Sequence, residues 1–316
     1  MNKIKSSYRI IVSYRTIVSQ KAVSCAETNI TVHMNLSQLH LLALNVGCCI
    51  HDGDWNWKNV RSPFSRLYCV TEGHAKVELP SGTLSLKPGH LYFIPAYMQH
   101  NCICNSHFTH YYIHIFEDVA DGSGLLEDLD LPFEVKAEDG DFELMKRLCE
   151  INPTLKIPES NPQAYDNHKT LIANYQKNLR RPFCDKVESR GIMFILLSRF
   201  LNQAKIKNLA EDDRIRQAIS YMRKHIGENL DIEKLADNAC MSKVHFFRMF
   251  KEQTGETPNA YFIKKRMEKA ELLLITTEMP IKTIAVNLGY EDHSYFIRLF
   301  KKYSGITPQQ YRERRI

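Results

Sequence analysis

The sequence has no long apolar run. No stretch approaches the roughly 18 consecutive apolar residues that a membrane-spanning helix needs. Basic residues precede an apolar segment near the N-terminus, but Arg15 interrupts that segment before it reaches the length of a secretory signal core. We therefore expect neither a membrane span nor a signal peptide, and a cytoplasmic protein.

Regularly spaced cysteine pairs are also lacking. The chain has nine cysteines, an odd number, and no CxxC motif. A disulfide framework or a structural zinc site would show more regular spacing. The sequence instead predicts reduced, mostly buried thiols of a cytosolic protein, with no metal and no cofactor.

No catalytic motif stands out. The sequence shows neither a nucleophile paired with a base nor a glycine-rich loop of the kind that cradles phosphates. We therefore expect a protein that is not an enzyme, and its function has to be sought in binding.

The excess of positive charge is confined to one region. Of 42 Lys+Arg and 36 Asp+Glu, residues 213–316 hold 19 and 13, a balance of +6, and the remaining residues hold 23 of each. A length of 316 residues allows two domains. A basic domain favours a polyanionic partner, although a basic face that only aids solubility fits the charge equally well.

The same region contains a repeat. Residues 246–258 read FFRMFKEQTGETP and residues 296–308 read FIRLFKKYSGITP, and both copies are followed by a tyrosine, Tyr261 and Tyr311. In each copy, apolar residues at helical spacing predict a short helix, a turn and a second helix. Two such units, at about residues 230–255 and 280–305, have the pattern of helix-turn-helix DNA readers.

The ends of the second helices are marked by capping residues. Ser242 is placed as the N-cap in the first unit, and Asp292 or Glu291 in the second. Gly255 and Gly305 suit left-handed C-caps, and a Thr-Pro pair then opens the next helix in both units. Residues 258–276, between the units, form a predicted helix of about 28 Å, near the spacing of about 34 Å between adjacent major-groove faces.

The C-terminal region resembles the DNA-binding domain of the AraC/XylS family of transcription regulators. The resemblance rests on LADNACMSKVHFFRMFKEQTGETPNAYF, KAELLL and IAVNLGYEDHSYFIRLFKKYSGITPQQYR, and covers about a third of the chain. It implies double-stranded DNA as a partner and leaves RNA polymerase as a candidate partner. A responsive regulator of this kind would shift between two arrangements of its reading helices when a small molecule binds.

Exposed positions on the second helices are the predicted DNA contacts, and the resemblance supports them. Arginine pairs well with guanine, and apolar Phe247 and Ile297 either pack on thymine methyl groups or extend the helix core. The predicted base contacts are Lys243, Val244, Phe247, Arg248, His293, Ser294, Ile297 and Arg298. The predicted phosphate contacts are Ser242, Lys251, Lys264, Lys265, Lys301 and Lys302.

The N-terminal region shows a different pattern. From residue 61 to residue 116, short strands alternate with turns at 72–73 and 88–89, and residues 108–116 place alternate side chains on two faces. The run GHAKVELPSGTLSLKPGHLYFIPAYMQH resembles the cupin-like sensor domain that precedes the reader in this family. The predicted fold is thus α+β, a cupin-like β-barrel followed by helices and then an all-α domain with two helix-turn-helix motifs.

The same resemblance raises the question of a ligand. Aromatic rings and imidazoles suit a sugar or similar polar metabolite, and the predicted lining is Trp55, Trp57, Tyr92, His100, Tyr112 and His114, with aromatic core as the alternative. Cupin enzymes usually hold a metal with an HxH pair, which this sequence lacks. The histidines considered are His74, His90, His100, His110 and His114, and we read them as polar interior or turn residues.

The remaining predictions concern organisation. Residues 141–205 return to helical patterning, and Met193, Leu196, Leu197, Phe200 and Leu201 form a stripe that packs on its own domain or on a second subunit. Relatives often dimerise through helices placed here, which favours a homodimer. The predicted domains are residues 34–201, a linker at 202–212 and residues 213–316, with residues 1–33 an extension and Met1 or Met34 the natural start.

The leading hypothesis is a sequence-specific transcription regulator that senses a small polar molecule. The alternative from another class is a cupin-type metalloenzyme with an appended DNA-binding tail. A third hypothesis is a ligand-independent regulator whose barrel serves only to dimerise.

Overall fold

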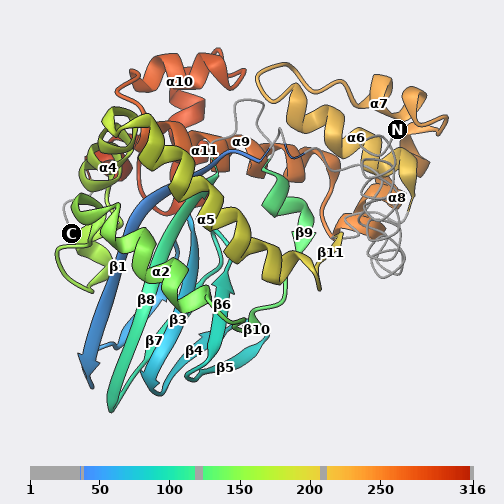
Figure 1. The fold of residues 1–316 in the computed structure, drawn as a ribbon. Helices are drawn as coiled ribbons and strands as arrows, with labels where there is room; N and C mark the ends of the chain where they lie inside the picture. The colour runs from blue at the N-terminus through green and yellow to red at the C-terminus, as the bar shows by residue number, and fades with distance from the viewer. Residues whose placement is uncertain (1–35, 37–38, 118–123, 207–211, 314–316) are drawn as a thin grey trace, which may run out of the picture.

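The protein combines an N-terminal β-sheet region with a helical C-terminal region (Figure 1). The structure, a computed structural model, describes residue 36 and residues 39–117, 124–206 and 212–313. The predicted extension at residues 1–33 lies outside the described residues. In the described part of the chain, no helix combines the length and the apolarity needed to cross a membrane.

Two antiparallel sheets make up the N-terminal region. The larger sheet has the strand order β1-β8-β3-β6-β10 and the smaller one β2-β7-β4-β5. The strands are β1 (Leu41–Asp52), β2 (Trp57–Val60), β3 (Ser65–Gly73), β4 (Ala75–Leu79), β5 (Gly82–Leu86), β6 (His90–Ile94), β7 (His100–Ile103), β8 (His107–Glu117) and β10 (Glu134–Lys136). No ladder joins the two sheets within the described ranges, so they are open layers rather than a closed barrel.

Strand β8, which lies between β1 and β3, confirms the predicted alternation. Phe108, Tyr112 and Phe116 point into the core between the two sheets, whereas Ile113 and Ile115 belong to the core on the opposite face of the larger sheet. The predicted turn at 88–89 is present, whereas Glu72 and Gly73, predicted as a turn, are the last two residues of β3 and pair with β8, so the chain turns one residue later. Each connection carries the chain from one sheet to the other, because β3 and β6 lie in the larger sheet while β4 and β5 lie in the smaller.

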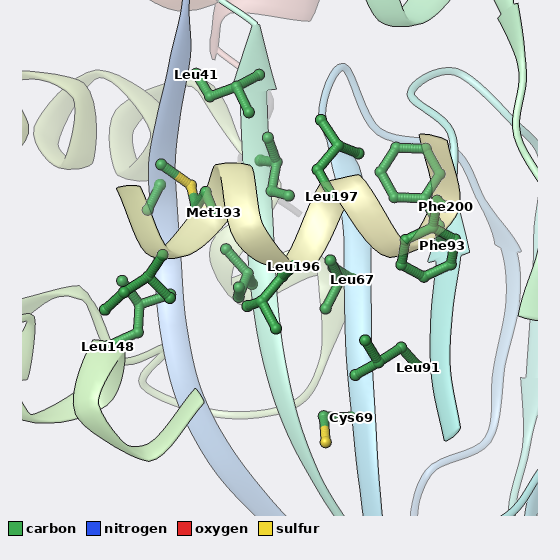
Figure 2. Packing of buried hydrophobic residues seen from close by; sticks show 14 of the residues in the cluster. Leu41, Leu67, Cys69, Leu91, Phe93, Leu148, Met193, Leu196, Leu197 and Phe200 are labelled. Carbon is green, nitrogen blue, oxygen red and sulfur yellow. The ribbon is translucent and has the colours of Figure 1, made fainter. Parts of the chain in front are cut away.

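Helices cover the outer face of the larger sheet. α5 (Phe183–Leu201) crosses the strands, with Met193, Leu196 and Leu197 directed onto Leu67 and its neighbours (Figure 2). Burial of these side chains stabilises the layer because each removes apolar area from water. The predicted stripe therefore packs on its own domain, and Leu201 lies half-buried at its edge.

The other segments of this region are short. They are 3₁₀ helices η2 (Leu125–Asp128) and η3 (Pro153–Leu155), and helices α2 (Asp141–Glu150), α3 (Pro162–Tyr165) and α4 (His168–Arg180). Strand β9 (Leu129–Asp130) pairs with β11 (Lys205–Ile206) in a separate two-stranded sheet, which ties the first part of the predicted linker to the segment that follows η2. Residues 207–211 lie outside the described residues.

The thiols are less buried than predicted. Among the eight described cysteines, all free, Cys69, Cys102 and Cys104 are buried, three are half-buried, and Cys184 and Cys240 are exposed. The exposed ones lie at a helix start and in the turn of the first helix-turn-helix unit, where the periodicity of a core gives no guidance.

The C-terminal region consists of helices with two cores. They are α6 (Asp213–Lys224), α7 (Ile232–Asn238), α8 (Lys243–Thr254), α9 (Pro258–Thr276), α10 (Ile281–Asn287), α11 (His293–Ser304) and α12 (Pro308–Glu313). Phe246 and Phe250 centre the first core, and Phe296 and Phe300 centre the second. Helix α9 contributes to both cores and has the predicted limits of residues 258 and 276.

Candidate nucleic-acid interface

Each helix-turn-helix unit presents one 12-residue helix, α8 or α11, after a seven-residue helix. The start of α8 is fixed by Ser242, whose side chain accepts a hydrogen bond from the backbone N–H of His245. The start of α11 is fixed by Asp292, which accepts from two backbone N–H groups. Both caps satisfy donors that a helix leaves unpaired, and of the two predicted alternatives Asp292 is the cap.

The two helices also end alike. Gly255 and Gly305 adopt the left-handed conformation at φ of 77° and 83°, which residues with a side chain rarely adopt. Thr257 then caps α9 by accepting from the backbone N–H of Ala260. These matched ends place α8 and α11 in equivalent positions within their units.

Most of the predicted base-contacting side chains lie on exposed surface. Lys243, Val244 and Arg248 are exposed on α8, with 82% of Val244 accessible, and Ser294 and Arg298 are exposed on α11. A single exposed valine is ordinary on a protein surface, so the exposure of Val244 leaves it accessible to a thymine methyl group but does not by itself indicate DNA.

The three remaining predicted base contacts are half-buried. Ile297 packs against the second core, so it serves at least partly to extend that core. Phe247 instead lines a surface groove with Lys243, Leu230 and Asn259 and does not join the first core. His293 lies at the first position of α11. The two apolar residues at equivalent positions therefore have different surroundings.

Charged neighbours differ between the units as well. On α8, the Lys243 ammonium lies 2.8 Å from Glu233, and the Arg248 guanidinium contacts His245 at 3.2 Å and Glu252 at 3.9 Å. On α11, Arg298 makes no salt bridge or side-chain hydrogen bond within the described residues. These exposed pairs on α8 are weak, so they leave its cations available to a stronger anionic partner.

The predicted phosphate contacts divide into two groups. Lys251, Lys301 and Lys302 are exposed, and Lys264 is exposed beside Glu256 at 3.1 Å. Lys265 is different: its ammonium contacts Glu127 of the N-terminal region and Glu268, and 11% of its side chain is exposed. In this arrangement of the protein, Lys265 is held by carboxylates and is not available to a phosphate.

The two units are joined by Arg266 of α9. Its guanidinium donates to the carbonyl oxygens of Ile226 at 2.8 Å and Glu228 at 2.5 Å, before the first unit, and lies over the Tyr290 ring of the second unit at 5.0 Å. A Cβ on Gly289 would lie 2.5 Å from the guanidinium, so only glycine permits this approach. Arg266 therefore fixes one unit against the other.

Sequence reasoning did not single out Arg266. It stands in the basic run KKRMEK, where nothing in the residue types distinguishes it from Lys264 and Lys265. Its position gave the available signal, because Arg266 is four residues after Phe262 and four before Ala270, on the buried stripe of α9.

Known proteins that resemble the C-terminal region share the helix-turn-helix assignment. A family model described as a helix-turn-helix domain matches residues 235–314. The arabinose operon regulatory protein of Escherichia coli K12 is 37% identical over 102 residues, which cover 32% of this chain and 35% of that protein. The C-terminal third of the chain is therefore similar to the helix-turn-helix region of AraC-type transcription regulators.

Other relatives show how far the similarity extends. The C-terminal domain of AraT, a response regulator from Geobacillus stearothermophilus, is 39% identical, and the match covers 33% of this chain and 88% of that one at a TM-score of 0.32. An uncharacterized HTH-type transcriptional regulator of Haemophilus influenzae is 24% identical over 296 residues, or 84% of this chain and 92% of that protein. The chain spans about a third of the length of the arabinose operon regulatory protein that it matches.

The N-terminal sheets contact the helix-turn-helix region directly. Helix α4 packs on α9, and Ile275 of α9 is part of the core between the two sheets. Arg61, just after β2, lies 3.3 Å from the carboxylate of Glu271 and donates to the hydroxyl of Tyr303 on α11 at 3.2 Å. Burial lowers the pKa of Arg61, but Glu271, Tyr303 and Tyr311 together outweigh burial, and the net effect raises that pKa.

The side chains predicted to bind a small molecule are mostly packed in the core between the sheets. Tyr92, His100, Tyr112 and His114 are buried, as is Trp55. The hydroxyl of Tyr112 accepts from the backbone N–H of Ile157, and the Tyr92 hydroxyl donates to the carbonyl oxygen of Ser85. Burial lowers the pKa of His100 to about 4, so its imidazole is neutral near pH 7.

Two further observations bear on this region. Trp57, the sixth predicted ligand residue, is half-buried and lines a cleft at the junction with the C-terminal helices. Within the described ranges, no group of three or more His, Cys, Asp or Glu side chains is arranged to hold a metal ion.

Proposed function

We propose that the protein is a sequence-specific DNA-binding transcription regulator. The observation that carries this proposal is the pair of equivalent 12-residue helices, α8 and α11, joined by the 19-residue helix α9 and fixed by Arg266. A helix of this length extends about 28 Å, near the spacing of about 34 Å between major-groove faces on one side of B-DNA. One chain would then occupy two neighbouring grooves.

The proposed division of labour follows the chemistry of the side chains. Arg248 and Arg298 read guanine edges, and Val244 and Phe247 contact thymine methyl groups. The other proposed base contacts are Lys243, His293, Ser294 and Ile297. The proposed phosphate contacts are Ser242, Lys251, Lys264, Lys301 and Lys302, with Lys265 added only if it leaves Glu127.

The N-terminal region is the proposed sensor. Its two facing sheets support a cupin-like sensor for a small polar metabolite, and the contacts of Arg61 with Glu271 and Tyr303 give a route from that region to the reader. The proposed domains are residues 34–201 and 213–316, connected at 202–212. We expect regulation in the cytoplasm, with RNA polymerase as a further partner.

A homodimer is also part of the proposal. The face of α5 turned away from the sheet exposes Phe183 (80% accessible), Val187 (55%) and Ile195, and Leu179 of α4 is exposed beside it. Phe183 and Val187 are four residues apart on one face of α5, and a second copy of the chain would remove these apolar side chains from water. Sedimentation over a concentration series should show a dimer, and Val187→Asp should shift it to one chain mass.

The decisive experiment selects duplexes from a random library with the full chain. We expect one sequence family with two preferred blocks about one helical turn apart. The double variant Arg248→Ala/Arg298→Ala should lose the preferred guanines in both blocks. Recovery of sequences no different from the starting library would contradict the proposal.

A further inference from the structure

A cleft of about 330 Å³ lies where the sheets meet the C-terminal helices. Its N-terminal wall comes from β2 and from residues 161–167, and its C-terminal wall comes from Ile275 of α9 and Tyr311 of α12. The volume is at the lower end of the range of about 300–1,000 Å³ found for small-molecule sites. In contrast to the packed core between the sheets, this space is open to a ligand.

We propose that this cleft is the effector site and that it takes a small polyhydroxylated molecule, a monosaccharide or its acid. This deepens the proposed function by naming the site and the ligand class, and it depends on that function only for the regulated activity. The side chains that carry the proposal are Trp57, Lys58, Arg61, Gln163, Asp166 and Tyr311.

The lining matches the chemistry of a sugar. The amide of Gln163 offers both a donor and an acceptor to adjacent hydroxyls, and it has no hydrogen-bond partner among the described side chains. The carboxylate of Asp166 contacts Ser62 and lies 3.9 Å from Arg66, which holds it in place at the cleft. Trp57 and Tyr311 supply aromatic rings, which suit the apolar face of a sugar ring.

The charged side chains at the cleft narrow the class of ligand further. The positive charge of Arg61 is matched by Glu271, and the negative charge of Asp166 lies near Arg66. Lys58 is exposed and has no ion pair within the described residues. The cleft therefore suits a neutral sugar, and Lys58 would add affinity for a sugar carboxylate.

The position of the cleft can couple ligand binding to the proposed DNA-binding helices. Arg61 lines the cleft and at the same time holds Glu271, whose side chain is 1% exposed, and Tyr303 of the second recognition helix. A ligand that contacts both walls binds the docked arrangement more tightly than a separated one. By linkage, it stabilises that arrangement of sheets and reader, and so changes the affinity for DNA.

The test uses the full chain and a panel of aldopentoses, aldohexoses and their uronic acids. The midpoint temperature of thermal unfolding should rise with the concentration of at least one member of the panel. Titration calorimetry should give the affinity of the protein for that sugar. Gln163→Ala and Trp57→Ala should each weaken binding about tenfold, whereas Gln217→Ala, which removes an exposed amide on α6, should leave it unchanged. Lys58→Ala should weaken binding of a uronic acid but not of a neutral sugar.

Two results would overturn the inference: no binding of any panel member, or binding that Gln163→Ala and Trp57→Ala leave unchanged. Gln163 is exposed, so its replacement should not impair folding even if that of Trp57 does. The duplex selection, run without sugar, separates the two proposals. Selected DNA without sugar binding defeats this inference alone, and sugar binding at the cleft without selected DNA defeats the proposed function alone.

Discussion

The two helix-turn-helix units share their backbone but differ in what surrounds them. Both have a 12-residue second helix, a polar N-cap and a left-handed glycine at the end. Lys243 and Arg248 on α8 have acidic or imidazole neighbours within their own unit, whereas α11 is contacted by Arg61 from the N-terminal region through Tyr303. The duplication therefore supplies two helices of the same build, and α11 is the one that Arg61 of the N-terminal region contacts.

The largest expected effect compares how much each of the two helix-turn-helix cores contributes to stability. Phe250→Ala and Phe300→Ala each remove a fully buried ring from the centre of one unit, and each should lower the free energy of unfolding by about 3–5 kcal/mol. Chemical denaturation followed by circular dichroism measures both. A loss confined to one variant would show that only one core supports its unit.

The next largest expected effect tests the contact between Arg61 of the N-terminal region and Glu271 of α9. Arg61→Ala removes one charged partner of the Glu271 carboxylate, which is 1% exposed, and should cost about 3 kcal/mol. The matched control is Arg147→Ala, which breaks an ion pair with Glu188 at 2.7 Å between exposed side chains and should cost about 0–1 kcal/mol. Thermal unfolding of both variants decides the comparison, and equal losses would contradict a role for Arg61 in docking.

A smaller effect separates the two arginines as base readers. Arg298→Ala should relax the preference for guanine in one block of the selected site by about 1–3 kcal/mol, and Arg248→Ala should do the same in the other block. Repeating the duplex selection with each variant measures the preference. If Arg298→Ala weakens all sequences equally, that side chain contacts phosphate rather than a base.

The smallest effect concerns the phosphate contacts. Lys301→Gln should reduce the slope of log affinity against log salt concentration by about 1, because one phosphate contact is lost. Lys265→Gln should leave the slope unchanged, since Glu127 and Glu268 hold Lys265 in this arrangement. Titrations of one duplex at several salt concentrations measure both slopes, and a change for Lys265→Gln would indicate that it leaves Glu127 on DNA.

Prediction from sequence succeeded where structure depends on neighbours along the chain. The limits of α9, the caps Ser242 and Asp292, and the alternation in β8 all follow from residue type and spacing over a few residues. The sequence pattern did not reveal strand β1, because residues 41–52 are buried at nearly successive positions. They lack the alternation of apolar and polar residues that marks a strand with one solvent-exposed face.

The sequence by itself determined that this protein carries two equivalent helical probes on a stiff connecting helix, because caps and periodicity act locally. Only the tertiary structure decided that Arg266 fixes the units together, that Glu271 receives Arg61 from 210 residues away, and that the open space lies at the domain junction rather than between the sheets. The physical reason is that a buried charge or a cavity is defined by side chains from distant segments, whose meeting no local pattern records.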